Sequence, residues 1–100
     1  MAAKLILTWD IKPNHEQEYF EFVVREFLPD VQKFGFTLSD AWVTVFGDQP
    51  QILVGATMEN VSGIKKIIQS EAWGLLIEKL MQYVVDFNEK IVLANGNFQF

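Results

Sequence analysis

Apolar residues recur along the chain with two periods, one typical of strands and one typical of helices. Segments rich in β-branched and aromatic residues predict four strands. These segments are residues 5–9, 36–46, 51–59 and 91–94. The sequence Gly-Asp-Gln-Pro at 47–50 predicts a turn that joins the second and third strands as a hairpin.

The first helical pattern follows the first strand. Asn14 is expected to cap this helix, with Gln17 completing a capping box. Its expected buried stripe consists of Phe20, Val23, Val24, Phe27, Val31 and Phe34. Because Pro29 removes a backbone hydrogen bond within this stripe, we expect a kink or break around residues 27–28. Gly35 is expected to end the helix.

The second helical region is expected to consist of two helices. Asn60 or Ser62 can cap a short helix that runs through Gln69, and Ser70 with Glu71 can begin the next. One face of this next helix is expected to carry Trp73, Leu76, Ile77, Leu80, Val84 and Phe87. The order β-α-β-β-α-β predicts a ferredoxin-like α+β fold, with the helices on one face of an antiparallel sheet. Residues 1–100 fit a single domain of this kind.

Both faces of the expected sheet carry apolar residues. Strict alternation places one set on the first face: Leu5, Leu7, Trp9, Phe36, Leu38, Trp42, Thr44, Phe46, Ile52, Val54, Ala56, Met58, Ile91 and Leu93. It places a second set on the opposite face: Ile6, Thr8, Ala41, Val43, Val45, Leu53, Gly55, Thr57, Val92 and Ala94. Helices can cover only one of these faces, so we expect a homodimer through the open one. The alternative is that residues 98–100 fold over that face within one chain.

The composition of the chain argues against several classes of binding partner. A net charge of −5 argues against nucleic acid, and no window approaches the roughly 18 apolar residues of a membrane span. The absence of cysteine excludes disulfides and thiolate metal sites and suits a cytoplasmic location. With one histidine and no cysteine, we expect neither a metal site nor a bound cofactor.

Several short runs resemble the dimeric α/β-barrel superfamily and, within it, the NIPSNAP-like proteins. These runs are Phe27-Leu28-Pro29, Gly35-Phe36-Thr37-Leu38, Ala41-Trp42-Val43-Thr44, Phe46-Gly47, Ser70-Glu71-Ala72-Trp73 and Lys90-Ile91-Val92. The resemblance implies a ferredoxin-like subunit whose sheet joins its twin into a barrel, often with a small-molecule pocket between sheet and helices. The superfamily includes cofactor-free monooxygenases acting on polycyclic aromatics, haem-handling enzymes, lactone isomerases and many proteins of no assigned activity. The fold therefore selects no single chemistry.

Three tryptophans are the strongest candidates for a ligand site. Trp9, Trp42 and Trp73 come from elements that meet in this fold and could line a cavity for an apolar or aromatic molecule. Polar groups for such a cavity could come from Thr8, Asp40, Thr44 and Tyr83. The alternative is that the tryptophans fill the core of a small domain.

Two residues are candidates for catalysis. His15 is the only histidine, but the first turn of a helix is usually exposed, so a surface role is the alternative to haem ligation or proton transfer. Asp40 lies in an otherwise apolar strand, where burial would make it a conceivable general base; the alternative is a solvent-facing bulge. We therefore expect a homodimeric small-molecule-binding protein. A cofactor-independent monooxygenase or isomerase acting on a hydrophobic aromatic substrate is the second hypothesis.

Overall fold

The computed structural model describes residues 2–43 and 51–93. Within these ranges, four strands form one antiparallel sheet in the order β2-β3-β1-β4. The strands are β1 (Ala3–Ile11), β2 (Thr37–Val43), β3 (Ile52–Met58) and β4 (Val84–Leu93). The helical elements are α1 (Glu16–Phe22), the π-helical segment η1 (Val23–Phe27), α2 (Leu28–Lys33), α3 (Val61–Ile68) and α4 (Glu71–Leu80).

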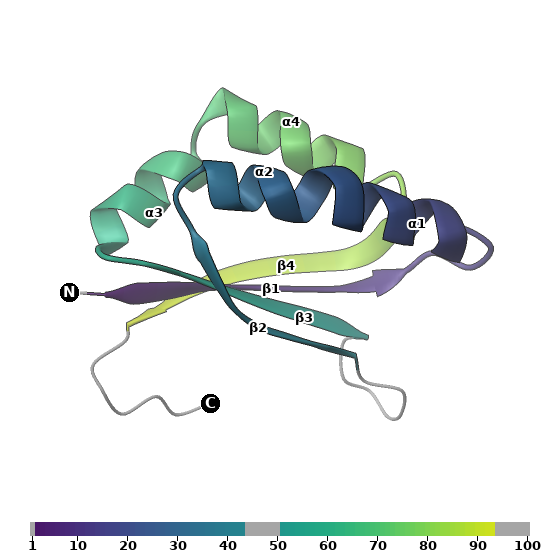
Figure 1. The fold of residues 1–100 in the computed structure, drawn as a ribbon, viewed down its shortest axis with the longest axis horizontal. Helices are drawn as coiled ribbons and strands as arrows, with labels where there is room; N and C mark the ends of the chain where they lie inside the picture. The colour runs from purple at the N-terminus through teal and green to yellow at the C-terminus, as the bar shows by residue number, and fades with distance from the viewer. Residues whose placement is uncertain (1, 44–50, 94–100) are drawn as a thin grey trace.

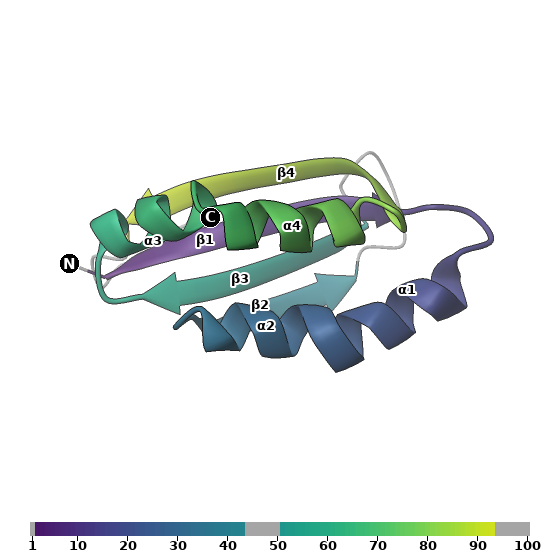
Figure 2. The same cartoon turned by 90° about the horizontal axis from the view of Figure 1, so that it is seen from above.

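All helices lie on one face of the sheet (Figure 1). Seen from above, they form two rows: α1 and α2 lie on the β2 side, and α3 and α4 lie on the β4 side (Figure 2). This arrangement confirms the expected ferredoxin-like α+β fold. None of these helices is both long and apolar enough to cross a membrane.

The core lies between the sheet and the helices. In the central strand β1, Leu5, Leu7 and Trp9 are completely buried on the helix-facing side. They meet the buried side chains of the helix layer, which are Tyr19, Val23, Phe27, Val31, Ile64, Trp73, Leu76 and Leu80. Alternation along β1 thus places its largest apolar residues under the helices, as the sequence predicts.

The first helical row departs from regular α-helix directly before Pro29. The backbone N–H of Leu28 donates to the carbonyl of Val23, five residues back, which closes the π-helical segment η1. The expected break around residues 27–28 is therefore confirmed. The wider turn changes which residues are buried, however. Phe20 and Val24, both expected in the buried stripe, are 51% and 65% exposed.

The buried residues of this row instead recur every four positions. Tyr19, Val23, Phe27 and Val31 all face the core. In a regular α-helix, steps of four residues drift around the axis, because one turn takes 3.6 residues. A π-helical turn contains more residues than an α-helical turn, so residues four positions apart stay on the same side of the helix. The predicted stripe contained Phe20 and Val24 in place of Tyr19, because it followed regular α-helical spacing up to residue 27 and did not include the π-helical turn over Val23–Phe27.

The last strand begins earlier than expected. The sequence predicted a helix whose apolar face extends to Val84 and Phe87, whereas α4 ends at Leu80 and β4 begins at Val84. Val84 pairs with Ile11 of β1, and the register shifts between Thr8 and Asp10 to leave a bulge in β4. Val84 and Phe87 are three residues apart, a spacing typical of a helix. In the structure they lie on either side of the bulge in β4, which adds one residue between them.

A second bulge changes the faces of β2. The register shifts between Leu38 and Asp40, so that Ala41 pairs with Val54 and not with a residue of the open face. The expected alternation, which separated Ala41 from Leu38, is therefore wrong beyond this bulge. One slip of a residue moves every later strand position to the other face.

Helix ends follow the predictions at three of four positions. Asn60 caps α3 by accepting from the N–H of Gly63, and Ser70 caps α4 by accepting from the N–H of Trp73. Gly35 follows α2 with a φ of +108°, as a helix-ending glycine should. The expected cap at Asn14 is wrong: His15 occupies that position without a side-chain cap. Asn14 instead adopts a φ of +69° in the turn before it.

Candidate functional site

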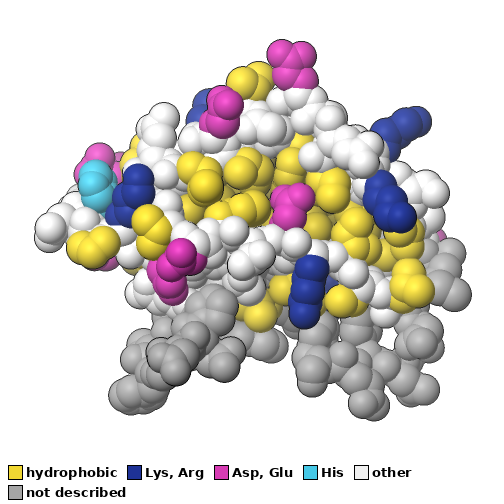
Figure 3. Space-filling model, turned by 180° about the vertical axis from the view of Figure 1, so that it is seen from behind, with side chains coloured by type: hydrophobic (Ala, Val, Ile, Leu, Met, Phe, Trp, Pro, Cys, Tyr) yellow, Lys and Arg dark blue, Asp and Glu magenta, His cyan; other side chains and the backbone are white. Residues whose placement is uncertain are grey.

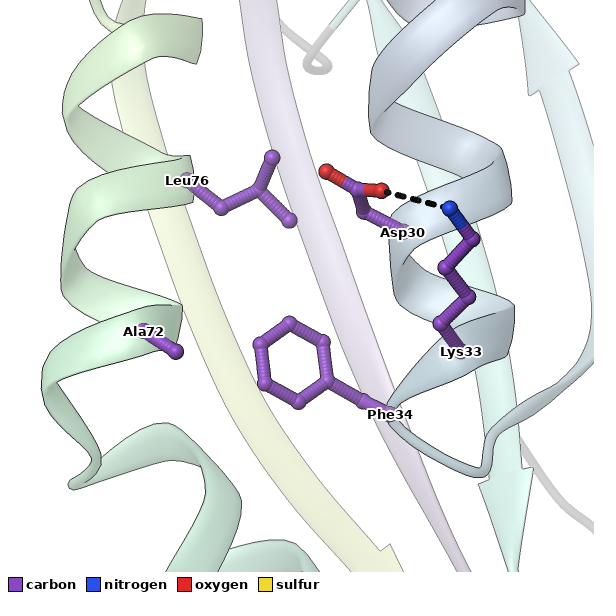
Figure 4. A pocket seen from close by; sticks show the side chains of 5 residues that line it. All are labelled: Asp30, Lys33, Phe34, Ala72 and Leu76. Atoms are coloured by element: carbon purple, nitrogen blue, oxygen red, sulfur yellow. Dashed lines mark ion pairs between the residues drawn. The ribbon is translucent and has the colours of Figure 1, made fainter.

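A pocket of about 260 Å³ opens between α2 and α4 (Figure 4). Helix α2 contributes Asp30 and Lys33, with Phe34 directly after its end, and α4 contributes Ala72 and Leu76. The Asp30 carboxylate projects between the two helices towards Leu76, and the ring of Phe34 lies beneath it in the view of Figure 4. The pocket thus combines an apolar wall with one ion pair.

The apolar wall of the pocket packs against the aromatic core through Phe34. The ring of Phe34 meets the ring of Trp73 edge-on, with 5.5 Å between the ring centroids. Trp73 also lies against Phe36, at 6.0 Å, and is only 2% exposed. Phe34 therefore stands between the pocket and Trp73, and both are held by neighbours that cannot easily move.

The polar edge of the pocket is a weak ion pair on one helix. Lys33 Nζ lies 3.9 Å from Asp30 Oδ1, three residues earlier. The side chain of Lys33 is 79% exposed and that of Asp30 is 35% exposed. An exposed pair of this kind contributes about 0–1 kcal/mol at most, so the lysine is free to exchange the carboxylate for another partner.

A second ion pair ties the two helical rows together next to the pocket. Lys79 Nζ on α4 lies 3.2 Å from Glu26 Oε1 in η1. Glu26 is four residues before Asp30, and Lys79 is three residues after Leu76, so this pair lies one helical turn from the pocket on both sides. It links η1 to α4 at this end, although an exposed pair contributes little to stability.

Two of the predicted ligand residues belong to the core. Trp9 is completely buried and packs against Tyr19, Phe27 and Phe87, with ring centroids 5.7–6.4 Å apart. Its Nε1 donates to the Tyr19 hydroxyl at 2.8 Å. Burial raises the pKa of Tyr19, and the hydrogen bond from Trp9 opposes that shift. Trp9 and Trp73 therefore touch other rings where a cavity between sheet and helices was expected.

The remaining predicted residues are dispersed. The ring of Tyr83 packs against Phe22 at 5.4 Å, and Thr8 pairs with Leu53 and Asn88 in the sheet. The register pairs Trp42 with Leu53 and Asp40 with Gly55, whereas Trp9 pairs with Ile52. The side chains of Trp42 and Asp40, and all of Thr44, lie outside the described part of the structure. Their roles in ligand binding or catalysis stay predictions.

His15 lies far along the first helical row from the pocket. Its side chain is 44% exposed, and its Nδ1 is 3.8 Å from Glu18 Oε1. Fifteen residues of helical chain separate it from Asp30, which corresponds to roughly 20 Å at 1.5 Å per residue. Within residues 2–43 and 51–93, no group of three or more His, Asp or Glu side chains could hold a metal ion.

The pocket residues do not stand out in the sequence, because each residue type is ordinary at its own position. Phe34 was assigned to the buried stripe, and Asp30 and Lys33 carry charges typical of a solvated helix face. Only the packing of α2 beside α4 brings these residues to Ala72 and Leu76. No spacing along the chain signals that proximity.

Glu89 is a second residue that sequence reasoning missed. It pairs with Leu7 and therefore belongs to the helix-facing side of β4, between Phe87 and Ile91. Its Oε1 accepts from Trp73 Nε1 at 3.4 Å. From the β4 side, hydrophobic side chains spread between the helices and the sheet, with acidic groups among them (Figure 3). The tryptophan N–H thus finds its partner at the sheet edge.

No protein-family model matches the sequence, and no curated protein matches it. Solved structures, in contrast, share the fold over nearly the whole chain. A NIPSNAP family protein from Agrobacterium tumefaciens is 17% identical, with a TM-score of 0.72 over 96% of this chain and 95% of that one. A NIPSNAP-like domain protein from Burkholderia xenovorans is also 17% identical, with a TM-score of 0.70 over 98% of this chain and 89% of that one.

A third structure, from Bacteroides fragilis, is described as a dimeric protein of unknown function with a ferredoxin-like fold. It is 9% identical and has a TM-score of 0.63 over 91% of this chain and 94% of that one. The expected likeness to NIPSNAP-like proteins is therefore confirmed at the level of the fold. At 9–17% identity, what these structures share with this chain is the fold.

Proposed function

We propose that this protein is a homodimer that binds a small, mainly apolar molecule in the pocket between α2 and α4. The pocket itself is the observation that carries the proposal, because it combines an apolar wall with a few polar groups, as small-molecule sites do. Its volume of about 260 Å³ is just below the range of roughly 300–1,000 Å³ typical of such sites. This size favours a ligand with a single ring or a short chain.

The aromatic pair behind the pocket gives the proposal a direct readout. A ligand that packs on Phe34 changes the surroundings of Trp73, whose ring lies 5.5 Å away. We expect small aromatic and aliphatic molecules to shift the indole N–H resonance of Trp73 and the amide resonances of residues 30–34 and 72–76 in two-dimensional NMR spectra. Saturation below millimolar concentration is expected. Shifts spread evenly over the chain, or none at all, would contradict the proposed site.

A variant that fills the pocket sharpens this test. Ala72 is exposed and projects towards the pocket, so Ala72→Leu should occupy part of the space and weaken binding without unfolding α4. Gly74→Leu is the matched control, because a Cβ at Gly74 meets no atom within 4 Å. It adds a side chain of the same size to the same helix away from the pocket. Equal binding by both variants would place the ligand elsewhere.

The open face of the sheet supports the proposal of a homodimer. No helix of the described residues covers it (Figure 1). Leu53 and Val92 are half-buried there, so part of their apolar surface is available to a partner. Lys4 and Ile6, on the same face of β1, are each only 5% exposed within one chain and add little to that surface. A stable interface buries about 800 Å² per partner. The Bacteroides fragilis structure is described as dimeric, which agrees with a dimer of this fold. The alternative to the dimer, cover of this face by residues 98–100 of the same chain, falls on residues outside the described part of the structure.

Light scattering after size-exclusion chromatography tests the dimer. We expect twice the mass of the 11.5 kDa chain at micromolar concentration. Leu53→Lys places a charge on the open face of β3 and should shift the protein to monomer. Val24→Lys, at a position already 65% exposed on the helical side, should leave the dimer intact. A wild-type monomer, or dissociation by both variants, would contradict an interface on the open face.

The cytoplasmic location expected from the sequence stays a prediction.

A further inference from the structure

We propose that the ligand of the α2–α4 pocket is a small organic cation, with an apolar or aromatic body and a primary ammonium group that binds Asp30. This inference rests on the proposed function and names the chemical class of its ligand. The polar group that projects into the pocket is the Asp30 carboxylate, which lies between Leu76 and the ring of Phe34 (Figure 4). The Asp30 side chain is 35% exposed, so a positive group in the pocket would reach the carboxylate from its less solvated side.

Lys33 is a replaceable partner for that carboxylate. Its Nζ is 3.9 Å from Asp30 Oδ1, at the long limit of an ion pair, and its side chain is 79% exposed. A ligand ammonium seated on the apolar wall could lie within hydrogen-bond distance of Asp30, where the wall shields one side of the pair from water and a charge-assisted hydrogen bond is stronger than a 3.9 Å contact. Lys33 can then return to solvent at little cost, because exposed lysine pairs contribute little.

Charge and ring chemistry also favour a cation. The face of an aromatic ring carries negative charge and attracts a cation placed within about 6 Å of it, and Phe34 is the aromatic wall of the pocket. The whole chain carries a net charge of −5, which raises the local concentration of cations and lowers that of anions. An anion would have to bind Lys33 alone, at the exposed edge and away from the apolar wall.

Three probes of matched shape separate the charge of the ligand from its apolar body. These are 2-phenylethylammonium, 2-phenylethanol and 3-phenylpropionate, titrated into the full chain at neutral pH and followed at the Trp73 indole N–H resonance. We expect the ammonium to bind on the order of tenfold more tightly than the alcohol, and the carboxylate to bind least. Equal affinities, or a preference for the carboxylate, would overturn the cation but leave the pocket in place. No binding of any probe would overturn the proposed function itself.

Two variants test the roles of Asp30 and Lys33 in opposite directions. Asp30→Asn should remove the advantage of the ammonium over the alcohol, while Asp86→Asn, an identical change at an exposed position, should keep it. Lys33→Gln should strengthen ammonium binding about twofold to fivefold, because it removes the competitor for Asp30. If Lys33→Gln instead weakens binding, or Asp30→Asn has no effect, Asp30 is not the ammonium site and the inference is wrong. Binding of 2-phenylethanol reports that each variant is folded.

Discussion

The indole Nε1 of Trp9 donates a 2.8 Å hydrogen bond to the phenolic oxygen of Tyr19, and both side chains are buried. This bond joins the middle of the sheet to the first helical row. It also provides an acceptor for the N–H of Trp9, whose side chain is completely buried. A buried donor that loses its acceptor costs far more than an exposed one, so the pair should be sensitive to the removal of a single oxygen.

Tyr19→Phe should lower the free energy of unfolding by about 1–3 kcal/mol, because it leaves the Trp9 N–H in the core without an acceptor. Chemical denaturation followed by circular dichroism measures this loss. Tyr83→Phe is the matched control: Tyr83 is only half-buried, and its ring keeps the contact with Phe22. The control should change stability by less than about 0.5 kcal/mol. A similar loss in both variants would mean that the Trp9–Tyr19 hydrogen bond makes no measurable contribution to the free energy of unfolding.

The same tyrosine should make the protein less stable in strong base. Burial raises the pKa of Tyr19 above its ordinary value of 10.0, against the opposing effect of the bond from Trp9. The folded chain therefore holds this proton more tightly than the unfolded chain does. Its contribution to stability is complete below pH 10 and declines as the pH rises from 10 through the folded-state pKa.

Denaturation midpoints measured between pH 8 and about 11 test this dependence. Tyr19→Phe should remove part of the decline, and Tyr83→Phe should not, since Tyr19 is still present in that variant. If both variants follow the wild-type curve in parallel, the titration of another group dominates in base.

Much of this fold could be predicted because its local signals agree with its packing. The side chains of Asn60 and Ser70 cap the starts of their helices, and Gly35 ends α2 because glycine readily adopts a positive φ. The apolar alternation of Leu5, Leu7 and Trp9 needs no tertiary information either. Such features are local, so a single sequence is enough to read them.

The errors come from insertions that shift a period. A π-helical turn before Pro29, a bulge next to Leu38 and another in β4 each add one residue to a regular element. Each shift moves the later residues to another face. Pro29 indicates a break in the first helical row, and a bulge is one of the two interpretations of Asp40, but neither signal shows that the element gains one residue. The α2–α4 pocket was missed for a different reason, because Asp30 and Leu76 approach only through the packing of two helical rows.

The bulge in β4 can be tested at Asp86, which adopts a φ of +55°. Aspartate tolerates this left-handed conformation better than most residues, and a β-branched residue tolerates it poorly. Asp86→Val should therefore destabilise the protein by about 1–2 kcal/mol, and Asp86→Gly should not. Asn88→Val, two residues later in the same exposed strand, is the control and should have little effect. Thermal melting distinguishes them; tolerance of valine at position 86 would show that the bulge lies elsewhere.

The hydroxyl of Ser70 bonds to both helices of the second row. Its Oγ donates to the carbonyl of Ile67 at the end of α3, at 2.6 Å, and accepts from the N–H of Trp73 in α4, at 3.2 Å. Ser70→Ala removes both bonds and should cost about 1–2 kcal/mol of unfolding free energy. Ser62→Ala, at an exposed position in α3, should cost little. Ser70 caps the turn of α4 that carries Trp73, the tryptophan that packs against Phe34 of the pocket wall. Loss of this cap should let Trp73 exchange between positions, so Ser70→Ala should also broaden its indole N–H resonance. Loss of stability without that broadening would mean that the cap stabilises α4 but does not position the tryptophan.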